Sequence, residues 1–131
     1  MRIDAFSQSG QWFKGNTHAH TSVSDGKLAP EQLINEYKKA GYNFLAITDH
    51  EIYSDYTQYD TDSFIMMPGV ELMLWQGDRK IAFTTHLVRL GIPGKNKFKH
   101  AQKLEYNNTT PTRELIDFLH DNGNFVILAH P

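Results

Sequence analysis

Four apolar segments of this 131-residue chain each end at residues that commonly bind metal ions. The first segment ends at His18 and His20, and the later three end at His50, Glu71 and His130. On an extended strand, residues i and i+2 point to the same side, so the first two imidazoles can converge on one ion. One such ending is common, but four in a chain of this length predict a shared site.

The composition narrows the kind of site and the kind of protein. Cysteine is absent, so a metal ion would be held by nitrogen and oxygen atoms alone. The 13 Lys and Arg residues are balanced by 15 Asp and Glu, and no basic stripe indicates a nucleic-acid partner. No apolar run approaches the roughly 20 residues of a membrane span, and the N-terminus lacks a signal-peptide core. A soluble, cytoplasmic protein is expected.

Predicted strands and helices alternate along the chain. Pro30 is suited to the first position of a helix, and Gly41 is suited to ending it. The apolar runs lack the alternation of a half-exposed strand, which is typical of strands covered on both faces in a parallel sheet. We therefore expect an α/β fold with the candidate ligands at the carboxyl ends of the strands. The predicted strands are 12–20, 43–48, 64–67, 70–72, 81–90 and 124–129, with helices at 30–40 and from Thr110–Pro111 to Gly123, a loop at 51–63 and a turn at 76–79.

The residues that carry this site prediction are imidazoles and carboxylates near predicted strand ends. Such donors suit Zn²⁺, Mn²⁺ or Fe²⁺, and a carboxylate such as Glu71 can bridge two ions. Two ions about 3.5 to 4 Å apart can clamp a phosphoryl group and activate water near neutral pH. The candidate metal ligands are His18, His20, Asp25, His50, Glu71, His86 and His130.

Each candidate also has a simpler interpretation when it is taken alone. A strand-end histidine can be an ordinary hydrogen-bonded side chain, Glu71 a solvated one, and Asp25 part of an Asp-Gly turn. His100 and His120 are expected on the surface. Asp49 is predicted to orient a ligand or cap the following loop rather than to bind metal. The nearby cations Lys27, Arg79 and Arg89 are interpreted as solvated surface charges.

Taken together, the motifs resemble the polymerase and histidinol phosphatase (PHP) superfamily. The opening Gly-x-Thr-His-x-His-Thr is most similar to stand-alone PHP phosphoesterases and to the carbaryl-hydrolase-like metallohydrolase branch, and the sequence does not separate these two. The matching motifs are Thr17-His18-Ala19-His20-Thr21, Ser24-Asp25-Gly26, Leu45-Ala46-Ile47-Thr48-Asp49-His50, Pro68-Gly69-Val70-Glu71, His86-Leu87 and Ala129-His130-Pro131.

The resemblance implies a distorted (β/α)7 barrel with up to three metal ions at its carboxyl face. By position, His18, His20 and Glu71 would hold one ion, and Glu71 would share a second with His86 and His130. Asp25 and His50 would contribute to a third ion. The expected catalytic residues are His18, His20, Glu71 and His130.

One family motif, an Asp-x-His pair on a late strand, has no counterpart after His130. Those two residues normally complete the first and third metal positions. The expectation is therefore a single PHP domain over residues 1–131 that represents the N-terminal portion of the barrel. It would be a fragment, a truncated product, or a half-barrel completed by a partner, and exposed barrel edges would favour an oligomer.

Three functions remain open at the level of the sequence. The first is a phosphoesterase that acts on a small-molecule phosphate ester. The second is a carbamate or amide hydrolase in which the same activated water attacks a carbonyl carbon. The third is a non-catalytic metal-binding fragment, which the missing Asp-x-His pair favours. A nuclease is disfavoured by the slightly acidic net charge of -2.

Overall fold

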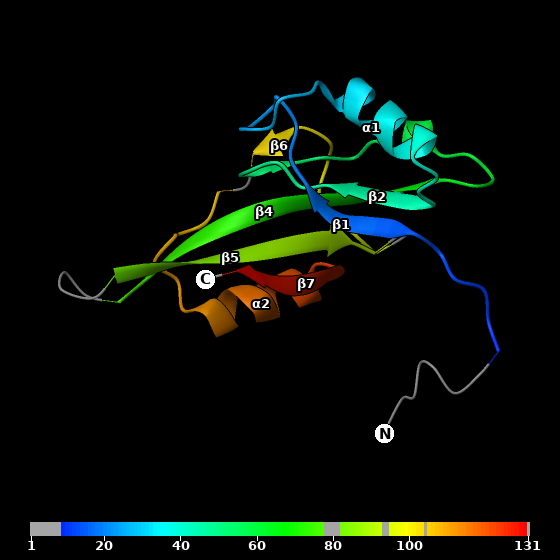
Figure 1. The fold of residues 1–131 in the computed structure, drawn as a ribbon. Coiled ribbons are helices and arrows are strands. Elements are labelled where there is room, and N and C mark those ends of the chain that lie inside the picture. Colours follow the sequence, from blue (N-terminus) through cyan, green and yellow to red (C-terminus); the bar gives the residue numbers. More distant parts are fainter. Residues whose placement is uncertain (1–8, 78–81, 93–94, 104, 131) are drawn as a thin grey trace.

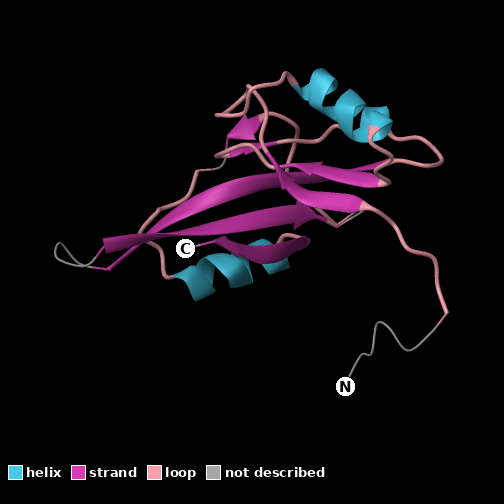
Figure 2. Cartoon of the chain, in the orientation of Figure 1, coloured by secondary structure: helices cyan, strands magenta, loops and turns pink. Residues whose placement is uncertain are grey.

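The computed structural model describes residues 9–77, 82–92, 95–103 and 105–130, and its centre is one curled five-stranded sheet (Figure 1). The order of the strands across the sheet is β1-β2-β4-β5-β7. A two-stranded ribbon of β3 and β6 and two helices complete the fold, in which strands predominate (Figure 2). The strands are β1 (Gly15–Ala19), β2 (Phe44–Ile47), β3 (Ile52–Tyr53), β4 (Ile65–Gly77), β5 (Ala82–Gly91), β6 (Gln102–Lys103) and β7 (Asn124–His130).

The predicted (β/α)7 barrel and α/β class are wrong for the part of the chain that the structure describes. β1, β2 and β4 run parallel, but β4, β5 and β7 are antiparallel neighbours. Only α1 (Pro30–Lys39) connects two adjacent parallel strands, whereas α2 (Thr112–Asp121) lies between the antiparallel β5 and β7. The result is a mixed, half-barrel-like sheet with two short helices.

Two further details differ from the predicted elements. β4 continues through Pro68 and Gly69 as one 13-residue strand. Pro68 pairs with the last residue of β2, and pairing with β5 starts at Gly69, so the missing N–H lies where the partners of β4 change. The predicted loop 51–63 contains β3 and a short 3-10 helix, η1 (Thr57–Tyr59). Asp78 and Arg79 of the predicted turn lie outside the described residues.

Both helices pack on the same face of the sheet, which we call the helix face. Successive side chains of a strand point to opposite faces, and Met66, Leu72 and Leu74 of β4 share one face. Met66 packs in the core beneath α1 with Ile34, while Leu72 and Leu74 pack with Leu115 of α2. No described helix is both long enough and apolar enough to cross a membrane.

The other face of the sheet, which we call the inner face, carries Met67 and Glu71 of β4 together with Val88 and Leu90 of β5. Val88 and Leu90 form a small apolar cluster with Ala46, and Met67 packs against it. Glu71 lies further along β4, beyond the end of β2 and opposite Val88 in the antiparallel ladder. The candidate ligands gather at this position.

Candidate metal centre

Glu71 is the centre of a cluster of five histidines. Its side chain is fully buried, and each of its carboxylate oxygens faces imidazole nitrogens. Oε1 lies 2.7 Å from Nδ1 of His86, 3.2 Å from Nε2 of His130 and 3.6 Å from Nε2 of His18. Oε2 lies 2.7 Å from Nε2 of His20 and 3.4 Å from Nδ1 of His50.

Two groups of potential ligand atoms share this carboxylate. One group is His18, Glu71 and His130, and the other is His20, His50 and Glu71. Within each group the ligand atoms lie within 4.8 Å of one another, which is compatible with coordination of one ion after small side-chain adjustments. A carboxylate common to both groups places two such positions next to each other.

The chemistry of the buried atoms fits a cation. Nε2 of His20 and Oε2 of Glu71 are buried and only 2.7 Å apart, yet neither has a hydrogen-bond partner among the described residues. Buried polar atoms are normally hydrogen-bonded, and an unpartnered pair needs an explanation. A cation bound by the lone pairs of both atoms would provide this explanation, because it would offset the cost of removing the two atoms from water.

Two imidazoles are oriented through their Nδ1 atoms. Nδ1 of His18 is 2.6 Å from the hydroxyl of Thr48, and Nδ1 of His20 is 2.6 Å from the carboxylate of Asp25. A partner at Nδ1 orients the ring, and the carboxylate of Asp25 also holds a proton on Nδ1 of His20, so that Nε2 is available as a ligand. In both residues Nε2 is the nitrogen that faces Glu71.

Asp49 anchors the loop that carries Asp25. Its fully buried carboxylate accepts hydrogen bonds from the backbone N–H of Thr21 at 2.7 Å and from the hydroxyl of Thr21 at 2.7 Å. It also accepts one from the hydroxyl of Ser24 at 2.7 Å. Asp49 thus supports a loop, one of its two predicted roles, but that loop precedes it in the chain, and none of these bonds involves an imidazole.

The pKa shifts in the cluster favour ionised Glu71 and Asp25 and a neutral His18. Burial raises the pKa of Glu71, but the hydrogen bond from His86 and the charges of the neighbouring imidazoles outweigh it, so the pKa lies below its ordinary value. Burial lowers the pKa of His18 against the opposing attraction of Glu71. The hydrogen bond from His20 lowers the pKa of Asp25. Deprotonated ligands of this kind are what a metal ion requires.

The structure brings all seven predicted ligands to one place, but their grouping differs from the sets implied by the resemblance. His18 and His20 belong to different groups, and His50 joins His20. His86 contacts Glu71 without belonging to either group. Asp25 contacts His20 and lies 3.7 Å from Nε2 of His50. Its position is that of a carboxylate that orients an imidazole.

Of the three nearby basic residues, only one contradicts the prediction of a surface charge within the part of the chain that the structure describes. Arg89 is fully buried, so its interpretation as a surface charge is wrong. It alternates with Val88 along β5 and therefore lies on the helix face, where its guanidinium stacks on Tyr53 and Phe98. Lys27 is exposed, as are His100 and His120, and Arg79 lies outside the described residues.

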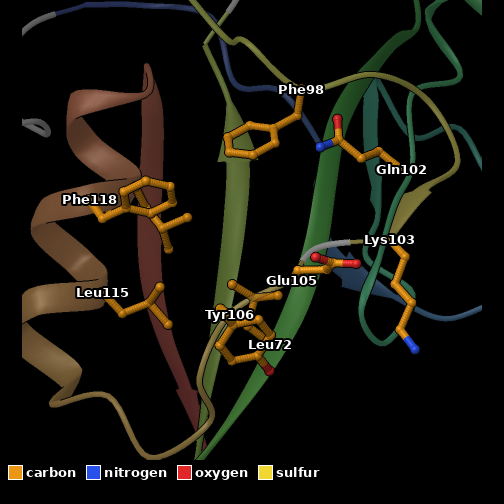
Figure 3. A pocket seen from close by; sticks show the side chains of 9 residues that line it. Leu72, Phe98, Gln102, Lys103, Glu105, Tyr106, Leu115 and Phe118 are labelled. Atoms are coloured by element: carbon orange, nitrogen blue, oxygen red, sulfur yellow. The ribbon is translucent and has the colours of Figure 1, made fainter.

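A separate cavity of about 370 Å³ lies on the helix face between α2 and β4 (Figure 3). Leu72, Leu115 and Phe118 supply apolar surface, and Tyr106 stands at its edge toward β4. The sheet separates this cavity from Glu71, so it is not part of the metal centre.

Sequence reasoning missed three residues around the centre. Thr48 is the hydrogen-bond partner of His18 and precedes His50 by two residues. On an extended chain, side chains two residues apart point to the same side, and this alternation could have identified Thr48. Glu51 and Tyr106 hydrogen-bond each other from positions 55 residues apart, for which a single sequence offers no signal.

In comparisons with known proteins, no family model matches the chain, and no curated protein is significantly similar to it.

Proposed function

We propose that this chain is a metal-dependent phosphoesterase of the PHP superfamily that uses two divalent cations, Zn²⁺, Mn²⁺ or Fe²⁺. The observation that carries the proposal is the buried Glu71 carboxylate, which is shared by two groups of potential ligand atoms. The order of the sequence motifs supports the same family. Histidine and carboxylate donors without thiolates suit all three of these ions.

In this proposal, residues of the chain have three roles: they bridge the two ions, supply nitrogen ligands and orient the imidazoles. Two divalent ions that share a carboxylate activate water as a nucleophile and stabilise the negative charge that develops on phosphoryl oxygens. Glu71 would bridge the two positions, while His18 with His130 and His20 with His50 would supply the nitrogen ligands. Thr48 and Asp25 hold two of these rings so that Nε2 is presented to the site.

The proposal is tested by removing the ions with a chelator and restoring Mn²⁺ or Zn²⁺ in an assay of aryl phosphomonoester and phosphodiester hydrolysis. We expect phosphate ester cleavage only with metal present. Glu71→Gln should bind neither ion and should lose at least about 100-fold in activity, since it removes a ligand from both groups. Glu36→Gln is the matched control, because Glu36 is an exposed glutamate paired with Lys39 on α1.

Two results would contradict the proposal. One is a metal-loaded protein that cleaves neither phosphate ester, and the other is a Glu71→Gln variant as active as the Glu36→Gln control. An aryl carbamate is assayed in parallel. Preferential cleavage of the carbamate would retain the metal centre and replace the phosphoesterase by a carbamate hydrolase.

A further inference from the structure

The backbone next to one candidate ligand adopts a conformation that needs support. Glu51, which follows His50, has a φ angle of 63°, in the left-handed region that non-glycine residues rarely adopt. Its backbone N–H donates to the carbonyl oxygen of Glu71 at 3.0 Å, and His50 and Glu71 form an isolated bridge. Such a conformation persists only when surrounding contacts hold it.

Tyr106 supplies the contact to the side chain of Glu51. The Tyr106 hydroxyl donates to Oε1 of Glu51 at 2.7 Å and accepts from the backbone N–H of Met73 at 2.9 Å. It also lies 2.8 Å from the carbonyl oxygen of Met73, which competes for the same proton. Burial and the hydrogen bond to Glu51 raise the pKa of Tyr106, so the hydroxyl remains a donor.

Tyr106 is itself firmly placed. Its ring packs against the apolar cluster on the helix face that contains Leu72, as the close-up of this region shows (Figure 3). The segment around it is fixed along β4 by a hydrogen bond from the backbone N–H of Trp75 to the carbonyl oxygen of Asn108 at 2.7 Å. Met73, which the hydroxyl contacts, pairs across the ladder with His86. The hydroxyl therefore connects Glu51 to a fixed part of the sheet beside the metal centre.

We propose that Tyr106 is a positioning residue for the metal centre, acting through Glu51 to hold the His50 imidazole where it can share an ion with His20 and Glu71. The inference rests on the proposed function, because it requires that this group binds an ion. The inference predicts that loss of the Tyr106 hydroxyl weakens the binding of one ion and not of the other. The group of His18, Glu71 and His130 contains no residue of the His50 segment and should not depend on Tyr106.

The test is a titration of the metal-free protein with Co²⁺, followed by visible absorption and by elemental analysis of bound metal. Tyr106→Phe removes one oxygen and keeps the ring. We expect the affinity for one of two ions to fall about 10- to 100-fold, with a changed Co²⁺ spectrum at that site, while the other ion binds as before. Tyr59→Phe is the matched control, because Tyr59 donates to the carboxylate of Glu31 on α1 in the same kind of pair.

Variants of Glu51 separate positioning from direct ligation. Glu51→Gln keeps an oxygen that can accept from Tyr106 and should bind Co²⁺ like the wild type. Glu51→Ala should reproduce the loss seen in Tyr106→Phe. If Glu51→Gln loses an ion while Tyr106→Phe does not, Glu51 is itself a ligand and the inference is wrong.

The remaining outcomes also decide the matter. Tyr106→Phe binding both ions as tightly as Tyr59→Phe overturns the positioning role and leaves the proposed function standing. An equal loss of both ions, accompanied by a lower melting temperature, would mean that Tyr106 is only structural. A wild-type protein that binds no Co²⁺ would overturn the metal centre and this inference together.

Discussion

Two residues of the cluster have pKa values that are shifted toward their deprotonated forms. Glu71 is fully buried and has a lowered pKa, while the burial of His18 lowers the pKa of its imidazole. Both shifts favour the protonation states that bind metal at neutral pH. In the metal-free protein they also make folding sensitive to acid, because the unfolded chain takes up protons more readily than the folded one.

We expect the melting temperature of the chelator-treated protein to fall by several degrees as the pH is lowered from 7 to 5, and further below pH 4.5. Unfolded histidine binds a proton near pH 6.5, above the folded pKa of His18, so stability falls with pH in that window. Glu71 acts in the same direction below its ordinary value of 4.5. Thermal unfolding of the wild type and of His18→Asn, compared across this pH range, checks the prediction. An equally steep decline between pH 7 and 5 in His18→Asn would contradict it.

At the scale of elements, the turn after β1 determines where Asp25 lies. The N–H of Gly26 donates to the carbonyl oxygen of Thr21 at 2.8 Å, which closes the turn. A Cβ atom at this position would lie 2.4 Å from the carbonyl oxygen of His20 and 2.7 Å from the backbone nitrogen of Thr21. Glycine is therefore needed for the close approach of this turn to the segment that carries the candidate ligands His18 and His20.

Gly26→Ala should lower the free energy of unfolding by about 1 to 3 kcal/mol, because backbone atoms must shift to admit the methyl group. It should also weaken the binding of the ion held by His20, since Asp25 would move away from Nδ1. Chemical denaturation and Co²⁺ titration measure the two effects. Gly10→Ala is the control, as a Cβ there meets nothing within 4 Å. Equal stability of the two variants would show that the turn adjusts freely.

Local signals were sufficient to predict where most elements lie. α1 begins at the predicted Pro30, and the predicted strand 43–48 is β2 with slightly narrower bounds. α2 follows the predicted Thr110–Pro111 start, and β7 matches the strand before His130. Proline, glycine and helical periodicity act within a few residues, so a single sequence contains this information.

The parallel direction predicted for all strands is wrong for the β4–β5 and β5–β7 pairs, although one signal against it was present in the sequence. Uninterrupted apolar runs occur in parallel and antiparallel strands that are covered on both faces, so composition did not separate them. The short segment between β4 and β5 leaves no room for a crossover helix, and an antiparallel pair follows from that length alone. Giving more weight to this connection would have replaced the parallel barrel by a mixed sheet.

The candidate site was predictable where it depends on motifs and not where it depends on distant packing. His18 and His130 lie near the ends of β1 and β7, as expected, but Glu71 lies in the middle of the 13-residue β4, so its predicted strand-end position is wrong although it contacts both histidines. The burial of Arg89 depends on stacking with Tyr53 and Phe98, which no local pattern encodes. Predicting burial from residue type alone therefore failed for this arginine.

At the scale of the whole molecule, the inner face combines the polar centre with an apolar trough. Ile65, Leu90, Phe125 and Ile127 line this trough, which has a volume of about 550 Å³. Phe125 is 58% exposed and Ile65 56% exposed. Contiguous apolar surface of this kind promotes association in water.

We expect the protein to bind an apolar fluorescent dye and to self-associate as its concentration rises, because the trough exposes hydrophobic surface. Phe125→Lys should reduce both effects at least twofold without changing the far-ultraviolet circular dichroism spectrum. Trp75→Lys, at an exposed apolar residue that does not line the trough, is the control. Dye fluorescence and sedimentation velocity provide the measurements, and equal behaviour of the two variants would contradict the prediction.

The position of Glu71 between candidate ligands from both edges of the sheet would link metal loading to the integrity of the sheet. His18 lies on β1 and His130 on β7, the two outermost strands, so an ion bound by both would connect the margins of the sheet through its middle strand. Any opening of either margin would dismantle that coordination sphere. Ion uptake would then protect all five strands of the sheet against proteolysis, because cleavage requires a local opening that the loaded form undergoes less often.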